Sequence, residues 1–192
     1  MRKAVLLVLL AATPLLAAER PAVFCKEEYA LCIKAPCLPI ITRTDDGKYV
    51  VTQANCTCEV LTGWSMGPGD CQSRKPVTRN NRTYLVSTYS NDYNETNKTL
   101  SCDKADTVWA LCYGAPCAID EKDPSKAVCT CPLKTGKSKT LGGNCDPKSC
   151  MSIWSAATPA QDKFANDHFY KTMKERGYLP PPLPPAQECP AH

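Results

Sequence analysis

Histidine, the residue most often used in acid–base catalysis, is nearly absent from this sequence of 192 residues. The two histidines are His168, in a stretch of helical periodicity, and His192, and neither lies beside an obvious nucleophile. The chain has no Cys-x-x-Cys pair, which thiol–disulfide oxidoreductases use, and no Gly-rich phosphate-binding loop. We therefore expect a protein that is not an enzyme and that carries no cofactor.

Long apolar runs are missing after the first 18 residues, so no later segment is predicted to span a membrane. At the start, Arg2 and Lys3 precede a short apolar run that ends in Ala17 and Ala18. This order of charge, apolar run and small residues is typical of a secretory signal peptide. We expect residues 1–18 to be removed after Ala18, or alternatively after Ala17. The other interpretation is an uncleaved membrane anchor.

The first cysteine, Cys25, follows Val23 and Phe24 rather than a small residue, which argues against bacterial lipidation. The mature protein is therefore expected to be exported, periplasmic or secreted, and to have no membrane contact.

A large excess of one charge is also missing, since 23 lysines and arginines stand against 19 aspartates and glutamates. Removal of residues 1–18 takes away two basic residues, which leaves a net charge of +2. That charge is too small to indicate nucleic acid as a partner, and Lys134–Lys139 is interpreted as a solvated loop. The partner, a protein or a small-molecule ligand, and the oligomeric state stay open.

Cysteine is what the sequence has in abundance, with 14 residues downstream of an export signal. In an oxidising compartment such a density favours disulfides, whereas in the cytosol it would favour metal or redox chemistry. A module of about 45 residues buries too little apolar surface to be stable without cross-links. The sequence therefore predicts a structural disulfide framework.

An internal repeat is the most specific signal in the chain. Ala-Leu-Cys-x-x-Ala-Pro-Cys and Cys-Thr-Cys-x-x-x-Thr-Gly each occur twice, in the same order. We therefore expect two tandem six-cysteine modules, residues 25–90 and 102–158. A weaker match, Leu85–Ser87 against Ile153–Ser155, follows the last cysteine of each module. The repeated cysteines are Cys25, Cys32, Cys37, Cys56, Cys58 and Cys71, then Cys102, Cys112, Cys117, Cys129, Cys131 and Cys145.

Each module is expected to be centred on one β-hairpin. Between Cys37 and Cys56, two runs rich in β-branched residues flank Asp45-Asp46-Gly47, and Asp-Gly in that setting is a strong hairpin signal. The matching segment between Cys117 and Cys129 is shorter, which is typical of the same hairpin with a clipped tip. The Cys-x4-Cys loop before each hairpin has a proline just before its second cysteine, which favours a turn.

Strand periodicity indicates which cysteines face each other. Residues i and i+2 of a strand share a face, so each Cys-Thr-Cys presents two sulfurs to one side. A bond within Cys-Thr-Cys would close a cramped ring, so each sulfur is expected to bond the Cys-x4-Cys loop. Six cysteines allow fifteen connectivities, of which we choose one for both copies. The expected pairs are Cys25–Cys71, Cys32–Cys58 and Cys37–Cys56, then Cys102–Cys145, Cys112–Cys131 and Cys117–Cys129.

The C-terminal segment, residues 159–192, is expected to be a short helix followed by a proline-rich strap. Thr158, Pro159 and Gln161 supply an N-cap, a proline at the first helical position and a capping-box partner. Apolar residues then recur at helical spacing up to Gly177, the expected C-cap. Residues 179–185 are proline-rich and predict polyproline II. Cys150 and Cys189 are expected to form a seventh bridge that fastens this tail.

The segment between the last cysteine of the first module and the first cysteine of the second, residues 72–101, is polar except for the strand-like run 83–90. Four Asn-x-Ser/Thr sequons are present, and they would be glycosylation sites in a eukaryotic secretory pathway but carry no meaning in a bacterium. The compact signal peptide favours a bacterium, and the source stays open. The sequons are those of Asn55, Asn81, Asn94 and Asn97.

The expected fold class is therefore a small, disulfide-rich, mainly β protein. The favoured function is an exported, disulfide-stabilised binding or structural protein, because disulfide-fixed loops are well suited to recognition. The two hairpin tips, residues 43–48 and 120–126, are where the copies differ most. A tandem protease inhibitor is one concrete version, with residues 33–36 or 113–116 as the inhibitory loop. The proline-rich stretch is expected to be a spacer or a surface wrap, and the alternative is that it binds an aromatic groove of another protein.

Thiolate metal binding is the alternative function. Two Cys-x-Cys pairs that each face a Cys-x4-Cys loop could hold Cu(I) or Zn²⁺, because soft thiolates favour these ions. Against it, the spacing differs from that of zinc ribbons, and export favours oxidation. The candidate metal ligands are Cys32, Cys37, Cys56, Cys58, Cys112, Cys117, Cys129 and Cys131.

Overall fold

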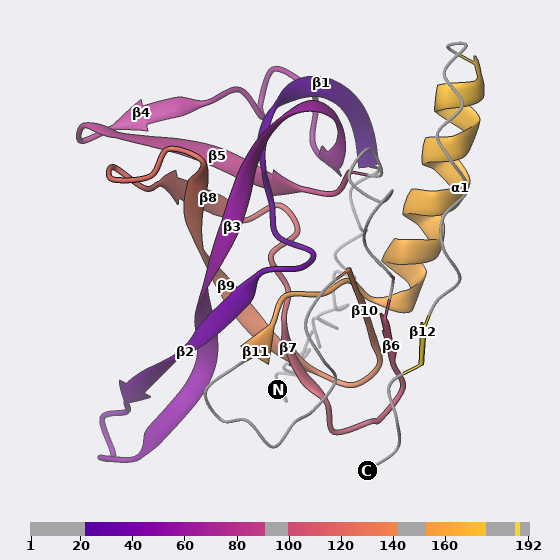
Figure 1. Ribbon diagram of the computed structural model, residues 1–192. Coiled ribbons are helices and arrows are strands. Elements are labelled where there is room, and N and C mark those ends of the chain that lie inside the picture. The colour runs from indigo at the N-terminus through magenta and orange to yellow at the C-terminus, as the bar shows by residue number, and fades with distance from the viewer. Residues whose placement is uncertain (1–21, 91–99, 142–152, 176–186, 189–192) are drawn as a thin grey trace, which may run out of the picture.

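The computed structural model describes residues 22–90, 100–141, 153–175 and 187–188, in which the chain is mainly β with one helix near the C-terminus (Figure 1). The signal peptide expected over residues 1–18 lies outside them. The elements in chain order are β1 (Ala22–Leu31), β2 (Pro36–Arg43), β3 (Tyr49–Pro68), β4 (Val77–Arg79), β5 (Arg82–Thr88), β6 (Leu100–Cys102), β7 (Val108–Ala110), β8 (Pro116–Ile119), β9 (Lys126–Thr135), β10 (Ser138–Thr140), β11 (Ile153–Trp154), α1 (Pro159–Glu175) and β12 (Gln187–Glu188).

The hairpin expected between Cys37 and Cys56 is present as antiparallel β2 and β3. Its turn closes where the Thr44 amide donates to the Lys48 carbonyl at 2.8 Å and Gly47 takes a positive φ of 83°. Glycine adopts this left-handed conformation without a Cβ clash. A register shift between Ile40 and Ile41 marks a β-bulge, which strengthens the local twist of the ribbon.

The shorter hairpin expected between Cys117 and Cys129 is present as β8 and β9. The Asp120 carboxylate accepts hydrogen bonds from the amides of Lys122 and Asp123, at 2.8 and 3.3 Å. Such side-chain bonds to nearby amides stabilise tight turns. A third hairpin joins β4 to β5 through Asn80 and Asn81, both at positive φ, as a two-residue hairpin turn requires.

One nine-stranded sheet contains strands from both repeated segments, with the order β11-β2-β3-β1-β5-β8-β9-β7 and β4 beside β5. Because β3 also pairs with β9, the pairings close a ring that runs β3-β1-β5-β8-β9 and back to β3. A second ring shares the β3–β9 contact and runs β9-β7-β11-β2-β3, with a single bridge joining β7 to the residue after β11. The boundary expected between residues 90 and 102 therefore divides the chain but not the sheet.

Two groups of buried residues form the core. The first consists of eight cysteines with small partners such as Ala54, Ala110 and Ala127, and with Leu85 as its one large aliphatic side chain. The second contains Tyr29, Leu31, Met66 and Tyr89, with residues of β1, β3 and the C-terminal region. Sulfur atoms and methyl groups thus take the place that branched aliphatic side chains fill in larger domains.

Helix α1 begins as its sequence predicts. Gln161 donates its amide hydrogen to the Thr158 hydroxyl at 3.1 Å, and the Thr158 amide donates to the Gln161 side chain at 3.0 Å. This reciprocal pair is the expected capping box. Ala165 turns into the second core group. The expected C-cap Gly177 and the proline-rich residues 179–185 lie outside the described residues.

Helix α1 is too short and too polar to cross a membrane, and it is the one helix in the part of the chain that the structure describes.

Candidate functional site

Five disulfides are present among the described residues, and each joins two cysteines that the sequence analysis pairs. They are Cys25–Cys71, Cys32–Cys58, Cys37–Cys56, Cys112–Cys131 and Cys117–Cys129. Cys102 is also disulfide-bonded. Its expected partner, Cys145, and the expected Cys150–Cys189 bridge lie outside the described residues.

Strand register brings the hairpin cysteines together. Cys37 lies opposite Cys56 in the first hairpin, and Cys117 lies opposite Cys129 in the second. Directly opposed residues of antiparallel strands have Cα atoms about 4.5–5.5 Å apart, so neighbouring sulfurs can bond without moving the backbone. The remaining sulfur of each Cys-Thr-Cys bonds the first cysteine of the preceding loop. Each hairpin is thus cross-linked once internally and once to the turn before it.

The four hairpin disulfides lie against one another across the β3–β9 contact. In this pairing Cys56 stands directly opposite Cys129. The Cys129 sulfur lies 3.1 Å from the Cys32 sulfur and 3.3 Å from the Cys58 sulfur. All eight cysteines are buried. Four stacked cystines therefore fill the centre of the sheet, and we call them the cystine core.

Six of the eight candidate metal ligands form two groups of three in the cystine core, in each of which the sulfurs lie within 4.8 Å, and Cys37 and Cys58 belong to neither group. Each group takes cysteines from both repeated segments. All six are disulfide-bonded in this structure, and a disulfide sulfur has no thiolate charge to offer a metal. The groups are Cys32, Cys117 and Cys129, and Cys56, Cys112 and Cys131.

The first hairpin extends beyond the cystine core as a two-stranded ribbon, residues 38–53, which we call the arm. Figure 1 shows it running away from the sheet on the side opposite α1. Leu38, Ile41 and Tyr49 are 64%, 69% and 72% exposed. The second hairpin has no such extension, since its cross-linked cysteines are 12 residues apart against 19 in the first. In the described parts of the chain, four of the seven exposed large apolar residues therefore lie on the arm, with Val51 as the fourth.

Apolar side chains lie on both faces of the arm. Ile41 stands opposite Val51, and Arg43 stands opposite Tyr49, at register positions that share the face of Cys37. Leu38 occupies the other face, opposite Asn55. Neither face of the ribbon is therefore a purely polar one.

The outer edge of β2 is open along the arm. The Ala35 carbonyl accepts from the Ser155 amide at 3.0 Å on this edge, and β11 pairs with β2 only at Pro36 and Cys37. Backbone groups alternate along a strand, so those of Ile41 and Arg43 point outward as those of Ala35 do. Pro39 is also at an outward position, but it has no N–H to donate. Beyond Cys37, no strand in the described parts of the chain pairs with that edge.

The arm's tip carries charges that are partly neutralised within it. Lys48 donates to the Asp46 carboxylate at 2.6 Å, and the Thr44 hydroxyl bonds the same carboxylate. Donation by Lys48, and then by Thr44, holds the pKa of Asp46 below its usual value. The tip therefore keeps its carboxylate charge at neutral pH, beside the exposed Arg43.

The two loops considered as inhibitory segments form hydrogen-bonded turns, of which the first, residues 33–36, is largely buried and the second, residues 113–116, is half-buried. Ile33 and Ala35 are only 7% and 3% exposed, and the Ala35 amide donates to the Ser155 hydroxyl at 2.9 Å. In the second loop, the Ala115 carbonyl accepts from the Ser87 amide at 2.9 Å. A protease needs an extended, accessible segment, which these bonds do not offer.

His168 has no catalytic setting among the described residues. Its ring stacks on Phe164 at a centroid distance of 3.7 Å, and Nδ1 lies 2.9 Å from the Phe164 carbonyl oxygen. Its side chain is otherwise exposed on α1. His192 lies outside the described residues.

Ser65 stands in a Gly-x-Ser-x-Gly sequence, residues 63–67, which sequence reasoning passed over. A nucleophile elbow requires a sharp strand-to-helix turn that exposes the serine. Here Ser65 lies within the long strand β3, is fully buried, and donates its hydroxyl to Glu27. The motif is therefore part of the packing in this fold and not a nucleophile.

A buried ion pair joins β1 to the segment after β3. The side chains of Arg74 and Glu27 are 1% and 8% exposed, with 3.4 Å between Nε and Oε1. Arg74 also donates to the Val23 carbonyl at 3.0 Å. Burial lowers the pKa of Arg74, and the nearby Glu27 charge opposes that shift. The sequence gives no signal of this pair, because an arginine in a polar segment is normally exposed.

The comparisons with known proteins identify no relatives. No family model, no curated protein and no solved structure matches the chain.

Proposed function

We propose that the protein is an exported, disulfide-stabilised binding protein whose recognition element is the arm. The observation that carries the proposal is the difference between the two hairpins. Both are cross-linked by opposed cysteines, but only the first continues past the cystine core with exposed Leu38, Ile41 and Tyr49. Four of the seven large apolar side chains exposed among the described residues lie on the arm, and gathered exposed apolar groups often mark interaction sites.

The proposal includes the view that both hairpins are copies of one scaffold, related by an internal twofold arrangement. It is supported by the β3–β9 register, in which Ala54 opposes Cys131 and Cys58 opposes Ala127, symmetrically about the Cys56–Cys129 pair. A self-complementary register of this kind is the signature of a twofold contact.

Exchanged strands support the same view. Strand β5, which follows the first hairpin and β4, sets Leu85 opposite Cys117 of the second hairpin. Strand β11, which follows the second hairpin and β10, sets Ile153 opposite Cys37 of the first. These are the positions matched by the weak sequence similarity between Leu85–Ser87 and Ile153–Ser155.

The partner we propose is an extended segment of another protein that adds to the outer edge of β2 as a further strand. The outward backbone groups of Ile41 and Arg43 would supply the hydrogen bonds, and Leu38 and Ile41 would supply side-chain contacts on the two faces. The edge already accepts β11 at Pro36 and Cys37. Pro39 occupies the outward position between Cys37 and Ile41 and has no N–H, so the proposed strand would pair beyond it, at Ile41 and Arg43.

The test is a selection from a displayed library of random peptides of about 8 residues, the length of one strand. Binders of the whole protein are compared on a hairpin-graft variant, in which residues 38–55 are replaced by the sequence of residues 118–128. We expect these peptides to lose at least tenfold in affinity on the graft and on Ile41→Pro, which removes an outward N–H. Lys122→Ala, in the second tip, is the matched control.

Two outcomes oppose the proposal: peptides that bind the graft as well as the parent, and peptides that depend on Lys122. The inhibitor version is tested separately with common secreted proteases. Because Ile33 and Ala35 are buried, we propose the arm as the binding element rather than those loops, and a stable protease complex that survives the graft would contradict this.

Thiolate metal binding is the second candidate, and the gathering of sulfurs from both segments into groups within 4.8 Å favours it. Intact mass after alkylation without reductant separates it from the first. A protein that takes up no label and gains no mass from Zn²⁺ or Cu(I) excludes the metal function. Free thiols or a metal adduct in the exported protein would support it and exclude a purely structural framework.

A further inference from the structure

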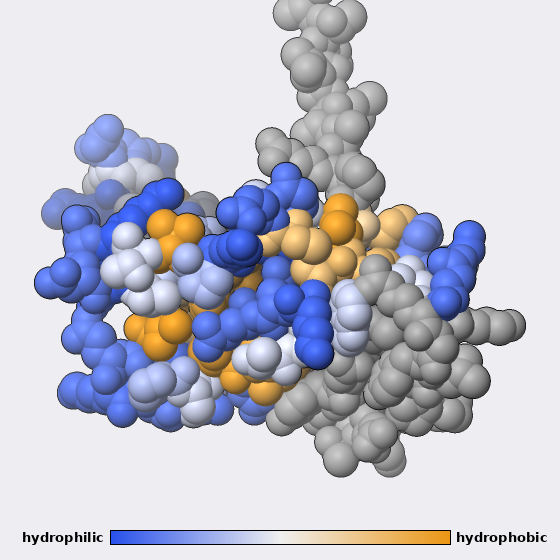
Figure 2. Space-filling model, turned by 90° about the horizontal axis from the view of Figure 1, so that it is seen from above, coloured by the Kyte–Doolittle hydropathy of each residue, from blue (hydrophilic) through white to orange (hydrophobic). Residues whose placement is uncertain are grey.

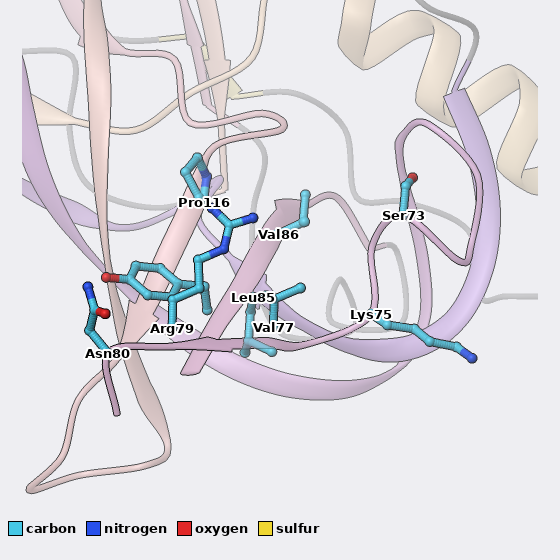
Figure 3. A pocket seen from close by; sticks show the side chains of 9 residues that line it. Ser73, Lys75, Val77, Arg79, Asn80, Leu85, Val86 and Pro116 are labelled. Atoms are coloured by element: carbon cyan, nitrogen blue, oxygen red, sulfur yellow. The ribbon is translucent and has the colours of Figure 1, made fainter. Parts of the chain in front are cut away.

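An open cavity of about 380 Å³ lies beside the β4–β5 hairpin (Figure 3). Ligand sites in proteins commonly have volumes of about 300–1,000 Å³, so the cavity matches a small molecule rather than a folded partner. It is lined by residues of β4, β5 and β8, by Asn80 of the β4–β5 turn and by two residues before β4. Leu85, which also belongs to the first core group, lies among them.

Strand register explains why these side chains share one face. Val77 and Arg79 are two apart on β4, and Val77 stands opposite Tyr84 of β5. Val86 is two residues after Tyr84 and stands opposite Pro116 of β8. Residues two apart, or directly opposed, point to the same side of a sheet. The three strands therefore present a mostly apolar surface with one guanidinium group on it.

The charge in this cavity is of one sign. Its lining includes Arg79 and Lys75 but no carboxylate. Within the described residues neither cation forms an ion pair, whereas the neighbouring Arg82 pairs with Glu121 at 3.4 Å. Figure 3 shows the Arg79 side chain extending toward Val86 and Pro116, with Lys75 pointing away from it at the other end. An unpaired guanidinium beside an apolar surface favours an anion that has an apolar body.

Among the described residues, the face drawn in the space-filling view carries no single continuous apolar surface. Figure 2 shows apolar residues in several separate groups divided by polar and charged ones, rather than one continuous apolar face.

We propose that this cavity binds a small monocarboxylate with an aliphatic body, of the size of a medium-chain fatty acid. The carboxylate pairs with the Arg79 guanidinium, which offers two parallel N–H donors. The Asn80 amide, in the adjoining turn, is within the same lining and supplies a further donor. The aliphatic body covers Val77, Val86 and Pro116. This site is independent of the arm and of the function proposed for it.

The experiment is calorimetric titration of the whole oxidised protein with octanoate, with octanol as the uncharged probe of the same length. We expect octanoate to bind and octanol to bind at least tenfold more weakly, since the charged pair is lost. Arg79→Gln should weaken octanoate binding at least tenfold. Arg82→Gln, in the same hairpin but paired with Glu121, should leave it unchanged.

A second pair of probes separates a free fatty acid from a peptide terminus: a tetrapeptide that ends in leucine, with a free or an amidated C-terminus. Equal binding of octanoate and octanol, an unchanged affinity in Arg79→Gln, or no octanoate binding at millimolar concentration would each overturn the proposal. Binding of the free peptide in preference to octanoate would overturn the fatty-acid assignment. Because Arg79 is exposed, its substitution leaves the fold intact, which circular dichroism verifies.

Discussion

The two hairpins of this protein are cross-linked in the same way and differ in what lies beyond the cross-link. In each, opposed cysteines of the two strands bond each other, and a second bond ties the hairpin to the turn before it. The second tip closes at once through hydrogen bonds to Asp120 and Asp123. The first continues as an arm with exposed apolar side chains. A rigid cystine core thus tolerates very different tips, which is where we expect function to differ.

The first repeated segment contains the buried ion pair of Glu27 and Arg74. Of the changes considered, neutralising Glu27 is expected to lower the free energy of unfolding most. Glu27→Gln leaves Arg74 buried without its counter-charge, and Arg74 already has two nitrogens without a hydrogen bond. Breaking a buried pair in this way costs about 3–5 kcal/mol. Urea unfolding of the variant measures the loss, with the exposed Glu28→Gln as control. Equal stability of the two variants would show that the pair is not desolvated as described.

Removal of the hairpin disulfides compares the copies directly. We expect the double variants Cys37→Ala/Cys56→Ala and Cys117→Ala/Cys129→Ala each to lose about 3 kcal/mol of unfolding free energy. The Cys37–Cys56 disulfide closes the longer loop, 19 residues against 12. By chain entropy its removal should therefore cost about 0.4 kcal/mol more than removal of Cys117–Cys129. Urea denaturation checks both. A loss confined to one hairpin would contradict the equivalence of the two.

The hairpin graft should change stability much less than either disulfide variant. The arm's exposed side chains contribute little to the core, and the graft retains both cysteines and an alanine in the place of the buried Ala54. We expect its unfolding free energy to stay within about 1 kcal/mol of the parent's. Thermal unfolding by circular dichroism measures this. A severe loss would mean that the arm is structural.

The smallest expected change in stability concerns α1, which follows the second repeated segment. The described residues contain no matching helix after the first repeated segment. Burial raises the pKa of Asp162, with the charge of Lys139 opposing it. The folded protein therefore holds this proton to higher pH than the unfolded chain does, and the charged form destabilises the fold above the folded pKa. We expect Asp162→Asn to raise Tm by about 2 °C at pH 7.

That gain should shrink as the pH falls toward 4, because the parent's Asp162 becomes protonated and its cost disappears. Asp167→Asn is the matched control, since Asp167 is exposed and pairs with Lys163. A gain that does not depend on pH would point to a packing effect instead of a charge effect.

Local patterns were sufficient to predict the two hairpins, the Cys-Thr-Cys sulfurs that face the preceding loop, and the start of α1. Each depends on residues close in sequence: Asp46-Gly47 between β-branched runs, the i and i+2 cysteines of one strand, and Thr158 with Gln161. These signals act through fixed backbone periodicities, so they can be recognised without knowledge of the rest of the fold. The full pairing was one choice among fifteen connectivities, and five of its pairs are confirmed.

Long-range pairing could not be predicted in the same way. The β3–β9 contact and the exchange of β5 and β11 between the hairpins join residues far apart in sequence. No local periodicity specifies which edge meets which. For the same reason, the burial of Arg74 and the cavity at Arg79 can be recognised only once the strands are placed. The Gly-x-Ser-x-Gly sequence at Ser65 can likewise be interpreted only once its position within β3 is known.

The central claim is that the open edge of the arm is the binding element, and amide hydrogen exchange at Ile41 and Arg43 tests it most directly. The measurement compares the free protein with the protein saturated by a peptide from the library. We predict fast exchange at both amides in the free protein and strong protection in the complex, with the second tip, residues 120–126, unchanged. Protection absent at Ile41 and Arg43 in a saturated complex, or present at the second tip instead, would contradict the account.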